Sequence, residues 1–289
     1  MAFDELMGLT NRLLANALAL AAVSARLRLD ELGEAGDPEL EAQLDRVISE
    51  LGVGEQLDEL EPGERAVLLS FSRSYLAQGL DLVDDPTRAN SWSHTDPVLL
   101  QAQGSASGVV ATLLTDLGLV EDGARILDVG TGVAGLAIAF CRILPAATVV
   151  GIDPWEPSLT LARANVAEAG LEDRVTLADA FVQEFEDGVG FDIAWLPSFF
   201  IPEPVLEPAV ARLHRLLRPG GRLVVGVTFA DASDPLGAVT DDLMTVRSGG
   251  SVADPTRAAA LLSSAGFEDV HELERTWNPP LRFVVGTRT

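Results

Sequence analysis

The chain has 289 residues, of which 44 are acidic and 20 basic, and its formal net charge is −24 at pH 7. Such a surface repels phosphate backbones and anionic lipid, so we expect neither a nucleic-acid nor a membrane partner. An apolar content of 47% is ample for a packed core, and the length suits one large domain plus a smaller one. Every fixed cation is an arginine, which excludes a lysine Schiff base or a P-loop lysine.

The few cysteines and histidines indicate neither disulfides nor metals. Cys141 is the single cysteine, so no intrachain disulfide can form, and a small buried side chain on a helix is expected there. His94, His214 and His271 have no acids or cysteines at metal-ligand spacing. We therefore predict no metal site.

The first hundred residues are predicted to be helical, with helices near 4–32, 38–51 and 62–82. The apolar run Leu13–Ala25 resembles the core of a signal peptide, but acidic residues precede it where a secretory segment is basic. Its leucines and alanines fall at helical spacing, which favours a helix. No stretch reaches the length of a membrane span without charges. The leucine-rich faces of these helices need cover, either from the rest of the chain or from a second copy.

Small and polar residues dominate the stretch 90–108, although Trp92 within it needs cover. A helix is predicted to follow at 109–117, just before the first strand. One interpretation of 90–108 is a linker whose Ser and Asp residues cap helices. We accordingly divide the chain into domains 1–108 and 109–289.

The most informative stretch is Arg125–Phe140, which predicts a buried strand, a glycine-rich turn and an apolar helix. Gly130, Gly132 and Gly135 satisfy the dinucleotide pattern G-x-G-x-x-G, which is a weak signal by itself. Asp128 lies two residues before the first of these glycines. Its carboxylate would repel a pyrophosphate and attract an ammonium or a sulfonium. These residues therefore favour S-adenosylmethionine (SAM) over a dinucleotide.

Two further predicted strands also end in an acid. The segment 148–153 ends at Asp153 and the segment 174–179 ends at Asp179, with a helix at 157–169 between them. Parallel strands bring their carboxyl ends to one edge of the sheet, where ligands of open α/β sheets bind. We expect the glycine turn and the acids to meet at that edge.

The remaining pattern continues the alternation of helices and strands. Strands are predicted at 191–196 and, after a Pro-Gly-Gly turn, up to residue 226. A helix at 235–246 is followed by a Gly-Gly run that would serve as the hinge of a lid. The last elements are predicted to be a helix at 254–265, strands at 267–274 and 281–287, and a turn at 278–281 between the two strands.

Over roughly residues 120–289 the sequence resembles the class I SAM-dependent methyltransferases. The resemblance implies an α/β fold with a Rossmann-like, seven-stranded, mostly parallel sheet flanked by helices, preceded here by an all-α N-terminal region. One departure is Ala134, which stands where the family has the third glycine of G-x-G-x-G. We expect this substitution to be mild.

The resemblance also implies roles for individual residues. Asp128 and the turn after it match the segment that holds the methionine part of SAM, Asp153 matches the acid on the ribose, and Asp179 matches the start of the adenine-reading segment. Gln103 and Ser107 precede the first strand, where relatives bind the methionine carboxylate. The full set of expected cofactor contacts is Asp128, Gly130, Thr131, Gly132, Asp153, Pro154, Trp155, Asp179, Ala180, Phe181, Leu196, Gln103 and Ser107.

Acceptor residues are expected after the fourth strand. The segment Leu196–Pro202 half-resembles the loop of amino-methylating enzymes but lacks its first polar side chain, which disfavours a base amine as the acceptor. Its phenylalanines favour an apolar or aromatic small molecule. His94 is the candidate general base, with His271 behind it. The expected acceptor contacts are Trp92, Pro197, Phe199, Phe200 and Met244.

These features predict a cytoplasmic enzyme that transfers methyl from SAM to a small molecule, in bacterial secondary metabolism. By analogy with small-molecule methyltransferases, the helical region 1–108 would form a homodimer or close over the substrate. Three alternatives stay open at this point. The fold could bind SAM and catalyse a non-methylating step such as a pericyclic reaction, it could bind NAD, or it could be a scaffold with a relict cofactor site.

Overall fold

The computed structural model describes residues 2–228, 234–277 and 281–289. The chain divides into two compact units, Met1–Pro86 and Thr87–Thr289. The predicted boundary at residue 108 lies inside a helix of the second unit. Residues 229–233, which precede the predicted helix at 235–246, fall outside the described residues, as does most of the predicted 278–281 turn.

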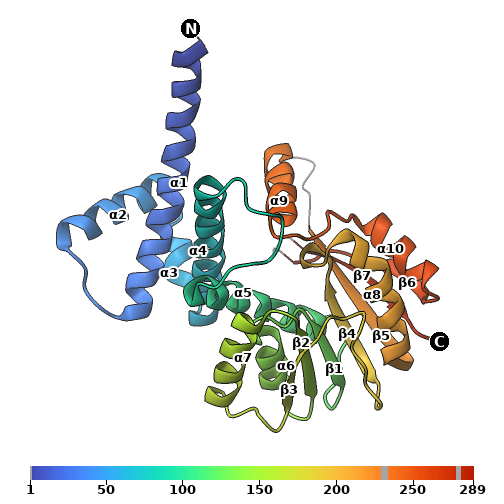
Figure 1. Cartoon of the computed structure of the whole chain (residues 1–289). Coiled ribbons are helices and arrows are strands. Elements are labelled where there is room, and N and C mark those ends of the chain that lie inside the picture. The colour runs from blue at the N-terminus through green and yellow to red at the C-terminus, as the bar shows by residue number, and fades with distance from the viewer. Residues whose placement is uncertain (1, 229–233, 278–280) are drawn as a thin grey trace. The chain divides into compact units, whose positions relative to one another are not determined.

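The first unit is all-helical, as predicted (Figure 1). Asp37 caps its second helix through the N–H groups of Glu39 and Leu40, and Glu61 and Glu64 form a capping box at the start of its fourth. The short third helix was not predicted. The helices are α1 (Ala2–Leu32), α2 (Pro38–Leu51), α3 (Gly54–Glu59) and α4 (Pro62–Asp84), and their core contains Leu27, Ile48, Leu57 and Leu69.

The second unit contains a seven-stranded sheet with the order β3-β2-β1-β4-β5-β7-β6. The pairs from β3 to β5 are parallel, whereas β7 runs antiparallel to both of its neighbours. This confirms the predicted mostly parallel, Rossmann-like sheet. The strands are β1 (Arg125–Val129), β2 (Thr148–Asp153), β3 (Val175–Asp179), β4 (Phe191–Pro197), β5 (Leu217–Thr228), β6 (Glu268–Glu272) and β7 (Leu281–Thr287).

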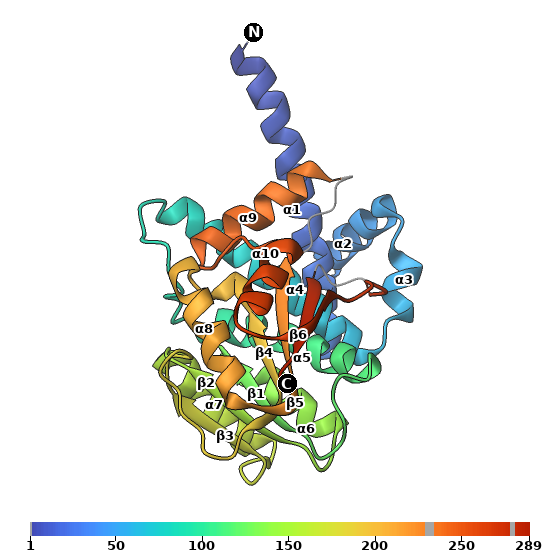
Figure 2. The same cartoon turned by 90° about the vertical axis from the view of Figure 1, so that its right-hand side faces the viewer.

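Two apolar clusters bury the two faces of this sheet, and helices cover both faces in Figure 2. One cluster joins the sheet to α5, α6 and α7, and the other joins it to α8 and α10. The helices of this unit are α5 (Pro97–Asp116), α6 (Gly135–Ile143), α7 (Glu156–Glu168), the 3₁₀ turn η1 (Ser198–Phe200), α8 (Glu203–Leu216), α9 (Pro235–Arg247) and α10 (Pro255–Ser264).

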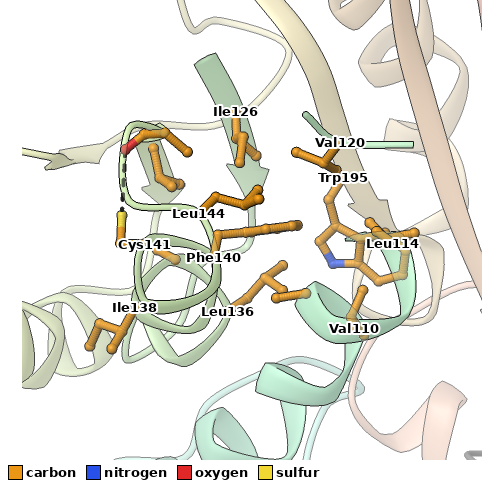
Figure 3. Packing of buried hydrophobic residues seen from close by; sticks show 14 of the residues in the cluster. Val110, Leu114, Val120, Ile126, Leu136, Ile138, Phe140, Cys141, Leu144 and Trp195 are labelled. Atoms are coloured by element: carbon orange, nitrogen blue, oxygen red, sulfur yellow. Dashed lines mark hydrogen bonds between the residues drawn. The ribbon is translucent and has the colours of Figure 1, made fainter. Parts of the chain in front are cut away.

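The close view in Figure 3 shows the first cluster, in which Phe140 of α6 and Trp195 of β4 point toward one another. Cys141 lies on the same helix and is 1% exposed, which confirms the prediction of a small buried side chain. Burial raises the pKa of its thiol. This cysteine therefore packs as a small hydrophobic residue.

Helix α5 begins at Pro97, where Asp96 accepts the N–H of Val98 as an N-cap, and not at Val109 as predicted. Its small residues serve packing. A Cβ added at Gly135 of α6 would lie 1.9 Å from the carbonyl oxygen of Gly104, so the two helices meet backbone to backbone. The small residues of 90–108 that suggested a linker therefore allow α5 to cross α6 closely.

Among the described residues, α1 and α5 are long and apolar enough to cross a membrane by length and composition, contrary to the expectation that no stretch would qualify. This is weak evidence, because the core helix of a soluble protein passes the same test. In α5, 39% of the apolar window is buried inside the protein, against 6% in α1.

Candidate functional site

The glycine-rich turn connects the end of β1 to the start of α6. Gly130 and Gly132 have φ angles of 69° and 56°, which lie in the left-handed region that glycine adopts without strain. The N–H groups of Gly130 and Thr131 both donate to the carbonyl oxygen of Ile152, at 2.8 and 3.0 Å. These donors tie the turn to β2. A ligand would therefore be offered the first turn of α6, which has no side-chain cap.

Asp128 lies at the end of β1 and is 2% exposed. Its described partner is a hydroxyl, since Thr131 Oγ1 donates to its Oδ2 at 2.7 Å. Burial raises the pKa of Asp128 to about 7. The hydrogen bond from Thr131 lowers this pKa, and the nearby charge of Asp153 raises it further. Gly151 makes room for this pair, because a Cβ there would lie 2.5 Å from Thr131 Oγ1.

Asp153 ends β2 and is bound by two backbone donors. Gly132 N–H donates to its Oδ2 at 2.9 Å and Trp155 N–H to its Oδ1 at 2.8 Å. Burial raises its pKa, against the lowering by these two bonds, and the charge of Asp179 raises it further. Asp179 pairs with Asp153 in the register of β3 against β2. The structure thus brings the three predicted acids to adjacent strand ends.

The remaining residues predicted near the adenine lie around Asp179. Phe181 is 53% exposed, Pro154 is exposed, and Ala180 is half-buried. Their exposure leaves apolar surface beside the acids that an aromatic base could cover. Their contact with a cofactor remains a prediction.

The aromatic residues predicted for the acceptor form one cluster. The ring centroids of Trp92 lie 5.0 Å from His94 and 5.2 Å from Phe200, and Phe199 lies 4.9 Å from Phe200, all edge to face. The indole Nε1 of Trp155 donates to the carbonyl oxygen of His94 at 2.8 Å, which connects this cluster to the cofactor side.

Buried polar groups hold the backbone behind the phenylalanines. Ser251 Oγ donates to the carbonyl oxygen of Ile201 at 2.7 Å, and Ser198 Oγ donates to that of Gly226 at 2.8 Å. A Cβ at Gly250 would lie 1.8 Å from the carbonyl oxygen of Phe199. A Cβ at Gly249 would lie 2.8 Å from Ser91 Cα. The predicted hinge is therefore a tightly packed junction, where both glycines allow close backbone contact.

Other predicted contacts are placed differently. Leu196 is fully buried in the cluster of α8 and α10, so its side chain faces the core, and contact of its backbone with a cofactor stays a prediction. Pro197 next to it is buried, with its Cγ 3.9 Å from where a Cβ of Gly130 would stand. Ser107 donates to the Gly104 carbonyl oxygen at 2.6 Å, within its own helix. Gln103 on α5 and Met244 on α9 are half-buried.

The histidines do not form a metal site, since no group of three metal-ligating side chains occurs in the part of the chain that the structure describes. His271 is exposed on the edge strand β6, where its Nδ1 lies 2.8 Å from the carbonyl oxygen of Asp269. His214 on α8 lies edge-on to Phe267. His94 is thus the histidine found in the aromatic cluster.

Sequence reasoning missed a pair of amides beside the glycine turn. Gln101 of α5 and Asn165 of α7 exchange hydrogen bonds, and Asn165 also donates to the carbonyl oxygen of Val133. The two residues are far apart in the sequence and belong to no motif, so no signal in the residues could have found them.

The arrangement fits the predicted cofactor. The described partner of Asp128 is the neutral hydroxyl of Thr131, which does not cancel a negative charge as an arginine would. The carboxylate therefore suits a ligand that carries a cation. Asp153 is fixed by backbone donors at the neighbouring strand end, where an acid suits a ribose diol. Both acids adjoin glycines that leave the backbone open to close approach.

The profile of a family described as a methyltransferase domain matches residues 126–221. The chain is 42% identical over 110 residues to the demethylmenaquinone methyltransferase of Thermus thermophilus, covering 38% of this chain and 50% of that protein. It is 32% identical over 186 residues to the nocamycin O-methyltransferase of Saccharothrix syringae, covering 57% of this chain and 66% of that protein. The chain thus spans only half to about two thirds of the length of these relatives.

The fold resembles that of mitomycin 7-O-methyltransferase MmcR, with a TM-score of 0.66 at 20% identity, over 100% of this chain and 98% of that one. At this level of identity the similarity concerns the fold alone. The matched residues, 126–221, include nearly all of the parallel strands β1 to β4, which belong to the mostly parallel sheet predicted for a methyltransferase domain. The chain therefore contains a methyltransferase domain of the class I, SAM-dependent type.

Proposed function

We propose that this chain transfers the methyl group of SAM to a small apolar or aromatic molecule. The observation that carries the proposal is that a hydrogen bond connects the candidate cofactor residues to the candidate acceptor residues. The acids at the ends of β1, β2 and β3 adjoin the glycine turn, and Trp155 links them to the cluster of Trp92, His94, Phe199 and Phe200. The similarity to nocamycin O-methyltransferase supports the same class of reaction.

Asp128 and Asp153 would hold the cofactor, and the first turn of α6 would face its anionic end. When bound, SAM supplies an electrophilic methyl group on a sulfonium. The aromatic cluster would orient a flat acceptor by edge and face contacts and exclude water from it. Positioning of this kind can provide most of the acceleration of a direct displacement.

His94 would act as the general base for an acceptor that must lose a proton. Its ring lies edge-on to Trp92, inside the aromatic cluster. With a phenolic acceptor, His94→Ala should lower kcat by about 10²-fold or more, while the affinity for S-adenosylhomocysteine (SAH) stays unchanged. Near-normal turnover of that variant would remove His94 from the mechanism.

Calorimetric titration with SAM and SAH tests the cofactor site directly. Asp153→Ala should weaken binding by about tenfold or more, because it removes the acceptor for the N–H groups of Gly132 in the turn and of Trp155 before α7. Asp122→Ala is the matched control, since Asp122 also accepts a backbone N–H, from Ala146, in an exposed turn before β1. Equal binding by wild type and Asp153→Ala would contradict the proposal, and binding of NAD(H) alone would favour the dinucleotide alternative.

A screen of small aromatic acceptors then tests methyl transfer through the release of SAH. Stoichiometric SAH and methylated product would support the proposal. Product formed without SAH would contradict it and favour a non-methylating reaction. The similar nocamycin enzyme comes from a bacterium. We therefore propose that this chain also acts in the cytoplasm of a bacterium, in secondary metabolism.

We also infer a homodimer through the helical N-terminal unit. Helix α1 exposes large apolar side chains along much of its length, including Phe3 at 73%, Leu6 at 62%, Leu14 at 53% and Leu18 at 61%. A surface of this kind favours association. Sedimentation velocity should show a dimer at micromolar concentration that Leu14→Glu with Leu18→Glu converts to a monomer. A monomeric wild type, or one that floats with liposomes, would contradict this inference.

A further inference from the structure

Trp155 has hydrogen-bond partners at each of its polar groups. Its N–H donates to Asp153 Oδ1 at 2.8 Å, and its carbonyl oxygen accepts the N–H groups of Ser158 and Leu159 in the first turn of α7. Its indole Nε1 donates to the carbonyl oxygen of His94 at 2.8 Å. The side chain is half-buried. These bonds place one residue between the acid of β2 and a segment distant in the sequence.

That segment, 87–96, contains neither helix nor strand. Most of its described polar contacts are local, since Arg88 Nη1 donates to the carbonyl oxygen of Ser91 and to Ser93 Oγ, both at 2.7 Å. Long-range bonds to it come from Trp155 and from Arg247, which donates to the carbonyl oxygen of Arg88 at 3.1 Å. Because the segment forms neither helix nor strand, long-range bonds of this kind contribute to its placement.

The same segment carries Trp92 and His94, the part of the aromatic cluster that comes from outside η1. The position of these rings relative to Phe200 therefore depends on how the backbone at His94 is held. The Trp155 indole holds it from the side of the cofactor residues.

We propose that Trp155 is a positioning residue that couples occupancy of the cofactor site at Asp153 to the placement of Trp92 and His94. The inference rests on the proposed function, because it takes Asp153 as a cofactor contact. A ligand that orders the Asp153 carboxylate orders the N–H of Trp155 bound to it, and the indole transmits this order to the His94 carbonyl. Coupling of this kind is reciprocal, so a well-placed segment 87–96 also favours the bound cofactor.

Hydrogen–deuterium exchange of the full chain with and without SAH tests this coupling. In the wild type, SAH should slow exchange about fivefold or more in peptides that cover 128–136 and also in peptides that cover 88–96. In Trp155→Phe, which keeps a ring and loses the indole N–H, the slowing should persist at 128–136 and disappear at 88–96. The dissociation constant for SAH should rise about fivefold or more, since reciprocity applies.

Trp277→Phe is the matched control. Trp277 is 7% exposed, its Nε1 donates to the carbonyl oxygen of Leu281 at 2.8 Å, and its ring stacks on Phe283. This variant loses the same kind of bond away from the site and should respond to SAH like the wild type.

Two outcomes would overturn the inference while leaving the cofactor site intact. One is slowing at 128–136 without slowing at 88–96 in the wild type, a result that does not depend on the folding of any variant. The other is full SAH-induced slowing at 88–96 in Trp155→Phe. An absence of slowing at 128–136 in the wild type would instead overturn the cofactor assignment, and the inference with it.

Discussion

Gln101 and Asn165 exchange two side-chain hydrogen bonds, each 2.9 Å long, between α5 and α7. Asn165 Nδ2 also donates to the carbonyl oxygen of Val133, at 2.9 Å, in the turn before α6. Both side chains are half-buried. The pair thus joins two helices to the glycine-rich turn, and it fixes the amide orientation of both residues.

A double-mutant cycle should detect this pair as a coupling energy. Gln101→Met and Asn165→Leu keep approximate size and remove the amides. Each should destabilise the protein, Asn165→Leu more strongly because it also leaves the Val133 carbonyl oxygen without its described donor. We expect a coupling energy of about 0.5–1.5 kcal/mol by denaturant unfolding. Additive effects would mean that the two amides act independently.

Substitution of Gly135 should disrupt the crossing of α5 and α6. A Cβ there would lie 1.9 Å from the carbonyl oxygen of Gly104, which is backbone and cannot move alone. We expect Gly135→Ala to cost about 3 kcal/mol or more of unfolding free energy, measured by urea denaturation. Gly79→Ala in α4 is the control, because nothing lies within 4 Å of its added Cβ. It should stabilise by about 0.5–1 kcal/mol, and equal effects of the two substitutions would refute the packing argument.

Ala134 has a φ angle of 65° and no exposed surface. A left-handed backbone costs an L-residue with a Cβ about 1–2 kcal/mol, so the departure from the family glycine carries strain that the sequence did not reveal. Ala134→Val should cost about 3 kcal/mol or more, since a β-branched residue is far less tolerant of this conformation. Ala134→Gly should leave the melting temperature close to that of the wild type. Loss of stability in Ala134→Gly as large as in Ala134→Val would contradict this explanation.

The raised pKa of Asp128 makes stability depend on pH in a defined direction. Burial raises its pKa in the folded state to about 7, against an ordinary value of 3.8 in the unfolded chain. The folded state therefore binds a proton that the unfolded state has released at intermediate pH. The stabilisation is fully present below pH 4 and is lost as the pH rises through 7. The melting temperature of the ligand-free protein should therefore fall between pH 5 and 8.

Asp128→Asn should flatten this dependence, because it cannot ionise. Thr131→Val removes the hydrogen bond that lowers the pKa and should move the decline to higher pH. Asp153 contributes in the same direction, since its pKa is also raised. A melting temperature of Asp128→Asn that falls as steeply as that of the wild type would show that Asp128 is not the source of the pH dependence.

Much of the fold could be predicted because local signals and tertiary structure agree. The predicted bounds of β2, β7 and α2 coincide with the observed ones. Strands that end in an acid and helices that follow Asp-Pro carry their own start and stop signals. The start of α5 was missed even though it follows Asp96-Pro97, because the Gly and Ser residues after that signal lower helix propensity, whereas here these small residues allow the crossing with α6.

The arrangement of the candidate site was predictable in part, for a comparable reason. Acids at strand ends follow from the topology. Trp92, His94, Phe199 and Phe200 form one cluster, and their contact with an acceptor stays a prediction. Side chains along β4 point alternately to the two faces of the sheet, and that of Leu196 points into the core below α8 and α10. Which helices cover which face cannot be predicted from the strand alone. The packing at Gly249 depends on a segment far away in the sequence, which no local pattern contains.

The junction at Gly249 and Gly250 separates the side chains that can vary in this protein from the backbone positions that cannot. The backbone at Phe199 is fixed by a contact that admits no Cβ on Gly250, whereas its ring packs edge to face on the ring of Phe200. Directed evolution of the acceptor range that we propose should therefore succeed at Trp92, Phe199 and Phe200, and libraries that randomise the two glycines should yield mostly misfolded protein.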